Sequence, residues 1–391
     1  MKYEKYLSQT GIKTPPSGIR EFFDIVYTKP ECISLGVGEP DFDTPWNISD
    51  SGIYSIKDGY THYTPNRGLP ELRDIITKKL HQSIDIFYEP DSEIIITLGV
   101  SQGLDLALRS LIDPGDEIII VEPCYVSYKA NVEMLYGRAV VVETTSEENF
   151  QINTDRLEKA INSRTKAILL NYPSNPTGTS ITKTELEKIA GIAIKHDLIV
   201  LSDEIYSHIT YAEEHFSIAR LPGMKERTIY LNGFSKSHAM TGWRLGYVCG
   251  PEFFISTMLK IHQYTALCAP IMSQYAAVEA IENGDKDVKR MLTEYTRRRN
   301  FIVNRFNEAG LPCSFPDGAF YVFPDITPTG LSSREFAFKL LEEKLVAVVP
   351  GDVFGNSGEG HIRCSYATSI DNIREALNRI EAFVKERPWE S

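Results

Sequence analysis

The sequence contains no long hydrophobic run and no excess of positive charge. Its 391 residues include 41 lysines and arginines against 53 aspartates and glutamates, which gives a net charge of -12 at pH 7. An acidic chain is poorly suited to nucleic acid or to an anionic membrane surface, so we expect neither as a partner. No apolar stretch approaches the roughly 20 residues that a membrane-spanning helix needs. Anionic ligands must therefore be held by a few specific cations.

Cysteine is scarce and dispersed. The six cysteines include no CxxC pair, which is typical of reduced, buried thiols and not of a disulfide framework. The first residues, MKYEKYLSQTG, lack the apolar region of a secretory signal. We expect a cytoplasmic protein and predict no metal site.

Two common nucleotide-binding motifs are also missing. The chain has no GxxxxGK[ST] sequence for a nucleoside triphosphate. The stretch SLGVGEPD contains Gly36 and Gly38 but no third glycine at the spacing of a dinucleotide fingerprint. Both ligand classes are therefore disfavoured.

Short β-branched runs alternate with helical patterns from about residue 94 to residue 250. Most of these runs are continuously apolar, as expected of strands buried on both faces. The predicted strands are EIIIT (93–97), DEIIIV (116–121), RAVVVE (138–143), KAILLNY (166–172), LIVLSDE (198–204), TIYLN (228–232) and LGYVC (245–249). This alternation predicts a mainly parallel sheet covered by helices, which binds ligands beyond the carboxyl ends of its strands.

The pattern changes after about residue 280. A long charged helix is expected near residues 285–308 and another near 333–344, with short apolar runs around them. We predict a large domain of residues 45–282 and a small α+β domain of residues 283–391. The N-terminal segment, residues 1–44, is too small to fold alone and is expected to pack on the small domain.

Lys236 stands almost alone in GFSKSHAMTGWRLGY (233–247), directly after a buried strand. Asp203 and Tyr206 follow the preceding strand, so the three side chains are expected to be neighbours. Taken singly, Asp203 also fits a helix N-cap and Lys236 a surface lysine. Together they suit pyridoxal phosphate: the lysine forms a Schiff base, the carboxylate keeps the pyridine nitrogen protonated and the phenol bonds the ring oxygen.

A phosphate would need a binding site nearby. The stretch TLGVSQGLDLAL (97–108) predicts a turn into a helix whose first amides, at Val100 and Ser101, favour an anion. The signal is weak alone, because every strand–helix unit has such a turn and Ser101 also suits an N-cap. Arg244, expected to be partly buried, supplies a formal charge, and Ser235 supplies a hydroxyl.

Two further side chains are candidates for substrate binding. Asn175 lies in NYPSNPTG (171–178), whose Asn-Pro and Thr-Gly pairs are also ordinary turn signals. Arg363 lies in HIRCSYA (361–367), on the strand face opposite to Ile362 and Cys364. Its alternatives are a solvated strand face or a bidentate clamp on a carboxylate.

These stretches, with SDEIY (202–206) and LGVGEPDFDTP (35–45), occur in the order found in fold type I pyridoxal-phosphate enzymes. The sequence resembles the class I/II aminotransferases, in the bacterial and archaeal branch that contains aspartate, aromatic and N-acetyl-diaminopimelate aminotransferases. The resemblance spans nearly the whole chain. It implies an α/β fold, with a large domain built on a mostly parallel seven-stranded sheet between helices and a small α+β domain.

The resemblance also implies roles for individual residues. Lys236 would be the Schiff-base lysine and would move the proton. Asp203 would pair with the pyridine nitrogen, and Tyr206 and Asn175 with the ring oxygen. The other implied roles are ring stacking by Tyr125, phosphate binding by Val100, Ser101, Ser235 and Arg244, and substrate-carboxylate binding by Gly38, Asn175 and Arg363.

Tyr63, in HYTPNRG, matches the tyrosine that reaches the phosphate of the partner subunit, which implies a homodimer with shared active sites. The sequence departs from the family at two places. Gly233 replaces a serine that many relatives use on the phosphate, and the turn at residues 99–101 reads Gly-Val-Ser instead of a more polar triplet. These departures affect individual phosphate contacts and leave the cofactor assignment in place.

The predicted activity is transfer of an amino group from an L-amino acid to a 2-oxo acid such as 2-oxoglutarate by a ping-pong cycle. An aromatic or other bulky neutral donor is favoured, and SGIREFF (17–23) either lines its pocket or straps the domains together. The alternatives are a C–S β-lyase of the same fold, or an aspartate or N-acetyl-diaminopimelate aminotransferase. A ligand-binding regulator is disfavoured, because the helix-turn-helix of such proteins is not found before the first motif.

Overall fold

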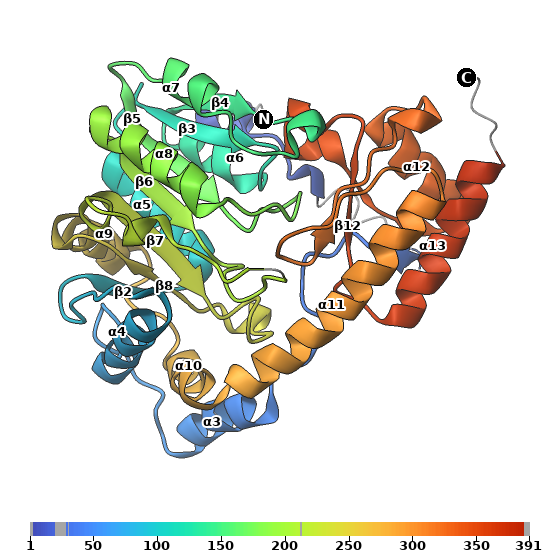
Figure 1. Cartoon of the computed structure of the whole chain (residues 1–391). Helices are drawn as coiled ribbons and strands as arrows, with labels where there is room; N and C mark the ends of the chain where they lie inside the picture. The colour runs from blue at the N-terminus through green and yellow to red at the C-terminus, as the bar shows by residue number, and fades with distance from the viewer. Residues whose placement is uncertain (1–2, 20–28, 30, 212, 387–391) are drawn as a thin grey trace.

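The computed structural model describes residues 3–19, 29, 31–211 and 213–386, and a seven-stranded sheet forms its centre (Figure 1). In spatial order the strands are β2 (Ile94–Thr97), β8 (Gly246–Cys249), β7 (Thr228–Gly233), β6 (Ile199–Asp203), β5 (Thr165–Asn171), β3 (Glu117–Glu122) and β4 (Arg138–Glu143). β8 is antiparallel to both neighbours, and the other pairs are parallel. The predicted mostly parallel sheet is confirmed, strand by strand.

Helices cover both faces of this sheet because successive apolar side chains of its strands point to opposite faces. In β2, for example, Ile95 packs with one helical layer, whereas Ile94 and Ile96 pack with the other. The first layer contains α5 (Gly99–Leu111), α6 (Ser127–Met134) and α9 (Glu252–Thr265). The second contains α7 (Thr154–Lys159) and α8 (Lys183–Lys195) over β3 to β6, and α4 (Pro70–Ile84) and α10 (Ile271–Asn283) over β2 and β8. Outside them, α3 (Trp46–Lys57) packs on α10.

A smaller unit follows, built on a core of its own. Its helices are α11 (Asp285–Glu308), α12 (Ser333–Lys344) and α13 (Ile370–Lys385). Its strands are β9 (Tyr321–Val322), β11 (Val349–Pro350) and β12 (Ile362–Ser365), with β12 in the middle, and β10 (Val346–Ala347). Figure 1 shows α11 running from the edge of the larger half to the side of α13. The helices expected at 285–308 and 333–344 are both present with those bounds.

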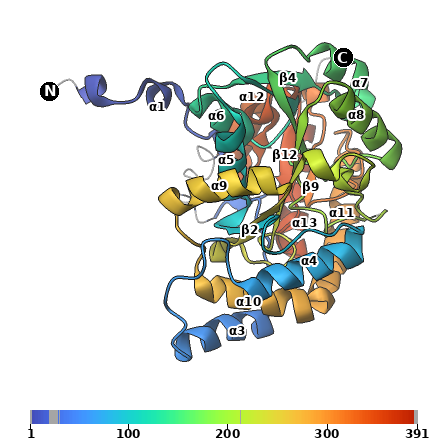
Figure 2. The ribbon, with the colours of Figure 1, turned by 90° about the vertical axis from the view of Figure 1, so that its left-hand side faces the viewer.

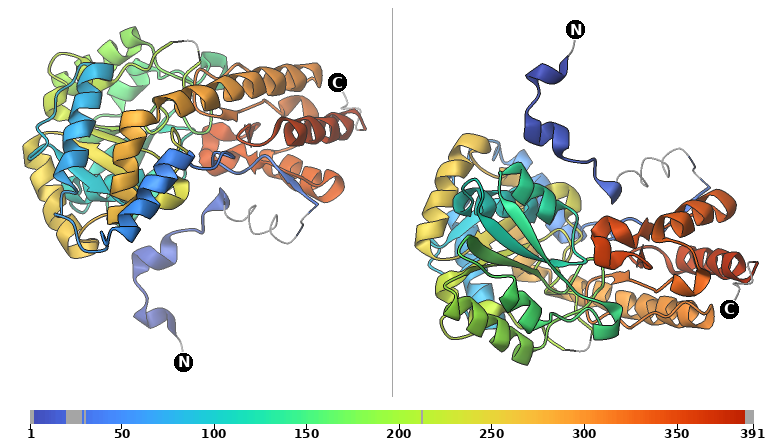
Figure 3. Two further views of the ribbon diagram at one scale, coloured as in Figure 1. Left: turned by 90° about the horizontal axis from the view of Figure 1, so that it is seen from below. Right: turned by 90° about the horizontal axis from the view of Figure 1, so that it is seen from above.

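The N-terminal segment contacts both halves of the molecule. β1 (Ile33–Ser34) pairs in parallel with β10 of the smaller unit. By contrast, α1 (Gln9–Lys13) approaches α6 of the larger unit, and Figures 2 and 3 show it standing away from the body of the protein. The three predicted boundaries, 1–44, 45–282 and 283–391, stay a prediction. Among the described helices, none combines the length and apolar character needed to cross a bilayer.

Candidate active site

A cleft of about 750 Å³ opens where the carboxyl ends of β5, β6 and β7 meet the smaller unit. Parallel strands bring residues that are distant in sequence to one edge of the sheet, and this edge is where the fold class binds ligands. Every predicted site residue except Tyr63 lines the cleft: Gly38, Val100, Ser101, Tyr125, Asn175, Asp203, Tyr206, Ser235, Lys236, Arg244 and Arg363. The sequence therefore located the cleft.

Lys236 lies three residues beyond β7 and points into the cleft. Its Nζ donates a hydrogen bond to the carbonyl oxygen of Gly38 at 2.6 Å. Burial lowers the pKa of Lys236 to about 8; the Glu39 carboxylate opposes this shift, whereas Arg363 and Arg244 add to it. An amine with this pKa exchanges its proton near neutral pH, as an acid/base group must.

Asp203 is the last residue of β6 and is buried beside Lys236. Tyr128 donates a hydrogen bond to its Oδ2 at 2.8 Å, and the amide of Ile205 donates to its Oδ1 at 3.2 Å. Burial raises the pKa of Asp203 to about 6, although both hydrogen bonds act in the opposite direction. The N-cap alternative is not realised, because a turn and not a helix follows Asp203 in the described chain.

The sequence analysis missed several cleft residues, including Tyr128, Tyr321 and Asn171. Tyr128 bonds Asp203, and Tyr321 shares a 2.8 Å hydrogen bond between hydroxyls with Tyr206. Asn171 donates from Nδ2 to the carbonyl of Asp203 at 2.9 Å and accepts the amide of Asn175 at 3.2 Å. Asn171 opens the stretch NYPSNPTG and Tyr128 lies three residues after Tyr125, so their polar character close to a strand end was the available signal. Tyr321 follows α11 by many residues, and no local pattern marked it.

The start of α5 forms a site for an anion. The helix begins at Gly99, so Val100 and Ser101 lie in its first turn and their amides lack partners within the helix. Arg244 lies against this turn, since a Cβ added to Gly99 would meet its Nη2 at 2.9 Å. Arg244 was expected to be partly buried, and this expectation is wrong: the residue is exposed and donates from Nη1 to the carbonyl of Thr241 at 2.9 Å. Within the described part of the chain, no carboxylate forms an ion pair with it.

The close packing around Gly233 explains why this position, a serine in many relatives, is a glycine here. It lies at the end of β7 against β8, where an added Cβ would meet the Cα of Gly246 at 2.9 Å and the carbonyl of Leu245 at 3.0 Å. A serine therefore cannot occupy this position without a shift of the backbone. The hydroxyl of Ser235, in the cleft wall, remains available to an anion.

Arg363 is buried at 2% exposure, which excludes a solvated strand face. Its Nη1 donates to Oδ1 of Asn175 at 2.8 Å, and its Nη2 donates to the carbonyl of Gly36 at 2.6 Å. Gly38, predicted with Arg363 to bind the substrate carboxylate, lines the same cleft, and its carbonyl accepts from Lys236. Among the described residues, Nε of Arg363 is buried without a hydrogen-bond partner. A buried guanidinium held only by neutral oxygens favours an incoming carboxylate.

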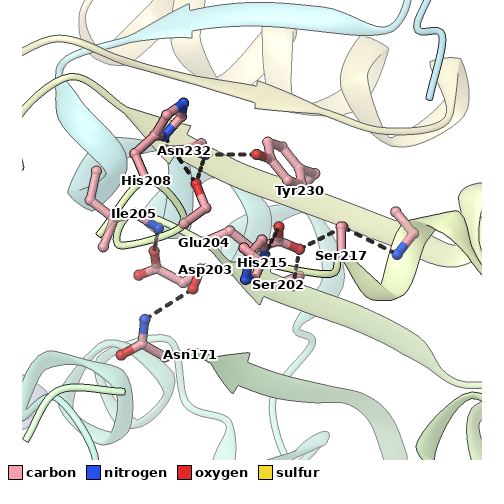
Figure 4. A network of polar contacts seen from close by, with 12 residues as sticks. Asn171, Ser202, Asp203, Glu204, Ile205, His208, His215, Ser217, Tyr230 and Asn232 are labelled. Carbon is pink, nitrogen blue, oxygen red and sulfur yellow. Dashed lines mark hydrogen bonds and ion pairs between the residues drawn. The ribbon is translucent and has the colours of Figure 1, made fainter. Parts of the chain in front are cut away.

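Glu204, next to Asp203, points to the other side of the strand and anchors a separate network (Figure 4). It accepts hydrogen bonds from Ser202 and Ser217, both at 2.7 Å, and pairs with Nε2 of His215 at 2.5 Å. This network fixes the chain just behind Asp203, and its carboxylate contributes to the raised pKa of Asp203, after burial. Glu204 is a supporting residue outside the cleft lining.

Two further expectations concern Tyr63 and the stretch SGIREFF (17–23). Tyr63 is 82% exposed and does not line the cleft of its own chain. Of SGIREFF (17–23), Ser17 and Ile19 line the cleft, whereas residues 20–23 lie outside the described residues.

This chain is similar to known proteins over nearly its full length. The model of the family described as "Aminotransferase class I and II" matches residues 30–380. YugH of Bacillus subtilis (strain 168), whose name describes it as an aminotransferase, is 53% identical over 97% of this chain and 98% of its own. An aspartate aminotransferase of Pyrococcus abyssi (strain GE5 / Orsay) is 47% identical over 95% of this chain and 96% of its own. The crystal structure of an aromatic aminotransferase from Pyrococcus horikoshii OT3 matches with a TM-score of 0.90 and 45% identity, covering 94% of this chain and 99% of that one.

Proposed function

This chain belongs to the class I and II aminotransferases, and from that premise we propose how its cleft moves an amino group from an amino acid to a 2-oxo acid. It is a pyridoxal 5'-phosphate-dependent enzyme. The residue roles and the substrate described below are our assignments. The observation that carries them is the convergence of Lys236, Asp203 and Arg363 on one cleft.

The cleft fits the cofactor at both of its charged ends. The start of α5, the hydroxyl of Ser235 and the guanidinium of Arg244 suit a phosphate, and we assign phosphate binding to them and to Val100 and Ser101. At the other end, the buried carboxylate of Asp203 suits a protonated ring nitrogen, because a cation there would compensate its burial. Tyr125 lines the cleft with its ring, and we assign ring stacking to it.

When bound, pyridoxal phosphate supplies an aldehyde for the amine and a ring that stabilises negative charge at the substrate Cα. Lys236 then takes up and returns the Cα proton, for which its pKa of about 8 is suited. Asp203 holds the proton on the ring nitrogen, and Tyr206 and Asn175 orient the ring oxygen. Arg363 and Asn175 hold the substrate α-carboxylate, with the loop at Gly36 and Gly38 beside them.

We favour an aromatic or other bulky neutral amino acid as the donor. The cleft wall includes Ile19, Val37 and Val126, and among the described lining residues Lys236, Arg244 and Arg363 are the cations. Each of these three cations already has an assigned role. The described lining of the cleft therefore offers no further cation to a carboxylate on the substrate side chain. The expected acceptor is 2-oxoglutarate. An aspartate or N-acetyl-diaminopimelate donor, or β-elimination from a cysteine conjugate, is the alternative.

A donor screen tests the assignment. The purified holoenzyme is supplied with 2-oxoglutarate and single L-amino acids, and glutamate is measured. We expect the highest kcat/KM with phenylalanine, tyrosine or leucine. A clear preference for aspartate would refute the neutral-donor assignment, and pyruvate with ammonia released from a cysteine conjugate without glutamate would support the lyase.

Arg363→Lys tests the carboxylate clamp. Lysine keeps the charge but not the two-pronged geometry, so kcat/KM for the amino donor should fall by about 100-fold, mostly through KM. The matched control is the exposed Arg374→Lys, which should behave as the wild type. An unchanged KM in Arg363→Lys would show that the carboxylate binds elsewhere.

We also propose a homodimer in which Tyr63 reaches the phosphate of the partner subunit. The support is its exposure in a single chain together with the exposed Trp46, Tyr54 and Tyr264. Large aromatic side chains at this level of exposure are typical of an interface.

Complementation between two inactive variants tests this arrangement. Lys236→Ala and Tyr63→Ala are each expected to form inactive or weak homodimers. In a randomly mixed dimer population, one site in four pairs an intact Lys236 with an intact Tyr63, so about a quarter of the wild-type activity should return. If Tyr63 acted within its own chain, mixing would restore nothing.

A further inference from the structure

A loop of residues 36–44, which we name the crossing loop, passes between the two units and forms one wall of the cleft. Its backbone contacts both catalytic cations: the carbonyl of Gly36 accepts from Arg363, and the carbonyl of Gly38 accepts from Lys236. These bonds are made by main-chain atoms, so they depend on where the loop lies and not on its side chains. Whatever fixes the loop also fixes these two acceptors.

The ends of the crossing loop are tied to different units. Just before it, the amide of Leu35 donates to Ala347, and its carbonyl accepts from Ser365 of β12 at 2.6 Å. At the far end, the Thr44 hydroxyl donates to the carbonyl of Ala239 at 2.6 Å and accepts from Trp243 Nε1 at 2.9 Å. Within the loop, the Thr241 hydroxyl donates a hydrogen bond to the Glu39 carboxylate. The part of the loop beyond Glu39 needs a separate anchor.

Arg298 of α11 supplies that anchor. Its Nη1 donates to Oδ1 of Asp41 at 2.8 Å, and its Nε donates to Oε1 of Glu294 at 3.0 Å. The Arg298 side chain is only 6% exposed, and its guanidinium lies 5.2 Å from the centre of the Phe42 ring. Nη1 also lies 3.5 Å from the carbonyl of Tyr366, which directly follows β12. One buried guanidinium thus joins α11, the crossing loop and the strand that carries Arg363.

We propose that Arg298 and Asp41 are positioning residues that hold the crossing loop against α11, so that Gly36 and Gly38 present their carbonyls to Arg363 and Lys236. Neither residue lines the cleft, so neither touches the substrate directly. Loss of the pair leaves Glu39, bonded to Thr241, as the remaining side-chain anchor in the middle of the loop. It also leaves a buried cation short of one partner, which favours local rearrangement. The inference rests on the proposed roles of Arg363 and Lys236.

Arg298→Met keeps an unbranched apolar stem like that of arginine and removes the guanidinium. We expect kcat/KM for the amino donor to fall by about 100-fold, the scale of a displacement of roughly 1 Å at the reacting groups. KM should carry most of this loss, because Gly36 orients the carboxylate-binding Arg363. The matched control is Arg297→Met, the neighbouring arginine that also bonds Glu294 but is 61% exposed. The kcat/KM of Arg297→Met should stay within about twofold of the wild-type value, because a surface ion pair contributes little.

A double-mutant cycle separates positioning from general stability. Asp41→Asn should reproduce the rise in KM, and the double variant should be no worse than Arg298→Met alone, because both changes break one interaction. Thermal unfolding is measured for every variant, and kinetics are compared only below the lowest transition. If Arg298→Met does not fold, Asp41→Asn with Arg297→Met as its control decides the question.

Two results would overturn the proposal: kinetics of folded Arg298→Met or Asp41→Asn equal to those of Arg297→Met, or losses that add in the double variant. The kinetics of Arg363→Lys distinguish failure of this positioning proposal from failure of the proposed function. A normal KM in Arg363→Lys would refute the carboxylate assignment itself. A raised KM in Arg363→Lys with unaffected Arg298 and Asp41 variants would refute only the positioning role.

Discussion

Replacement of Lys236 by alanine is expected to abolish amino transfer, with a fall in kcat of about 10⁴-fold or more. The lysine is both the amine for the cofactor aldehyde and the group that moves the Cα proton, and general acid–base catalysis alone is worth up to about 10⁴-fold. No neighbouring amine can substitute, because the other cations among the described cleft residues, Arg244 and Arg363, carry guanidinium groups and not amines.

The measurement is single-turnover conversion of the best amino donor by enzyme loaded with pyridoxal phosphate. The exposed Lys188→Ala serves as the control and should retain full activity. Cofactor content is measured in parallel by absorbance, so that loss of chemistry is distinguished from loss of binding. A Lys236→Ala enzyme that contains cofactor and retains even a tenth of wild-type activity would contradict the assignment.

Asp203→Asn has the second largest expected effect, a fall in kcat of about 10²–10³-fold, the range measured when one preorganised electrostatic group is removed. Asparagine keeps the size of the side chain and its acceptor for Tyr128 but cannot hold the ring nitrogen protonated. The matched control is Asp74→Asn on the exposed face of α4, for which no change is expected. Activity of Asp203→Asn near the wild-type level would exclude this role.

The same variant should make the cofactor-free protein more stable. Burial raises the pKa of Asp203 to about 6 from its ordinary value of 3.8, so ionising it costs more in the folded protein than in the unfolded chain. This cost is absent below about pH 4, grows between about pH 4 and pH 6 and is complete above about pH 6. Asparagine has no proton to lose and avoids the cost. Thermal unfolding of both apo-proteins should therefore show a higher Tm for Asp203→Asn at pH 8 and a smaller difference at pH 4.

The sequence predicted the sheet well because its strands are locally encoded. Runs such as EIIIT and LIVLSDE are continuously apolar, and they are buried on both faces as that pattern requires. Asp203 and Lys236 were recognised because parallel strands bring their carboxyl ends together, a rule that needs no tertiary detail. The long helix at residues 285–308 was also predicted from its local sequence alone.

Contacts made across the two units were not predictable in this way. The bond from Arg363 to the carbonyl of Gly36 was not predicted, because the path of the crossing loop depends on residues far away in the sequence. Arg244 is exposed; its backbone is left-handed (φ 51°) and its guanidinium lies against Gly99. Tyr321 reaches Tyr206 only through the packing of β9 against β12. In each case the partner is set by tertiary packing and not by periodicity or a motif.

The crossing loop also has a consequence for biosynthesis. The bond between Gly36 and Arg363 joins residues 327 positions apart, and β1 pairs with a strand that begins at Val346. During translation, Gly36 leaves the ribosome long before Arg363 is synthesised. The sheet and the proposed phosphate site at α5 are complete by about residue 250, whereas the proposed carboxylate clamp needs almost the entire polypeptide. On these assignments, a nascent chain forms its phosphate-binding site well before it forms the site for the substrate carboxylate.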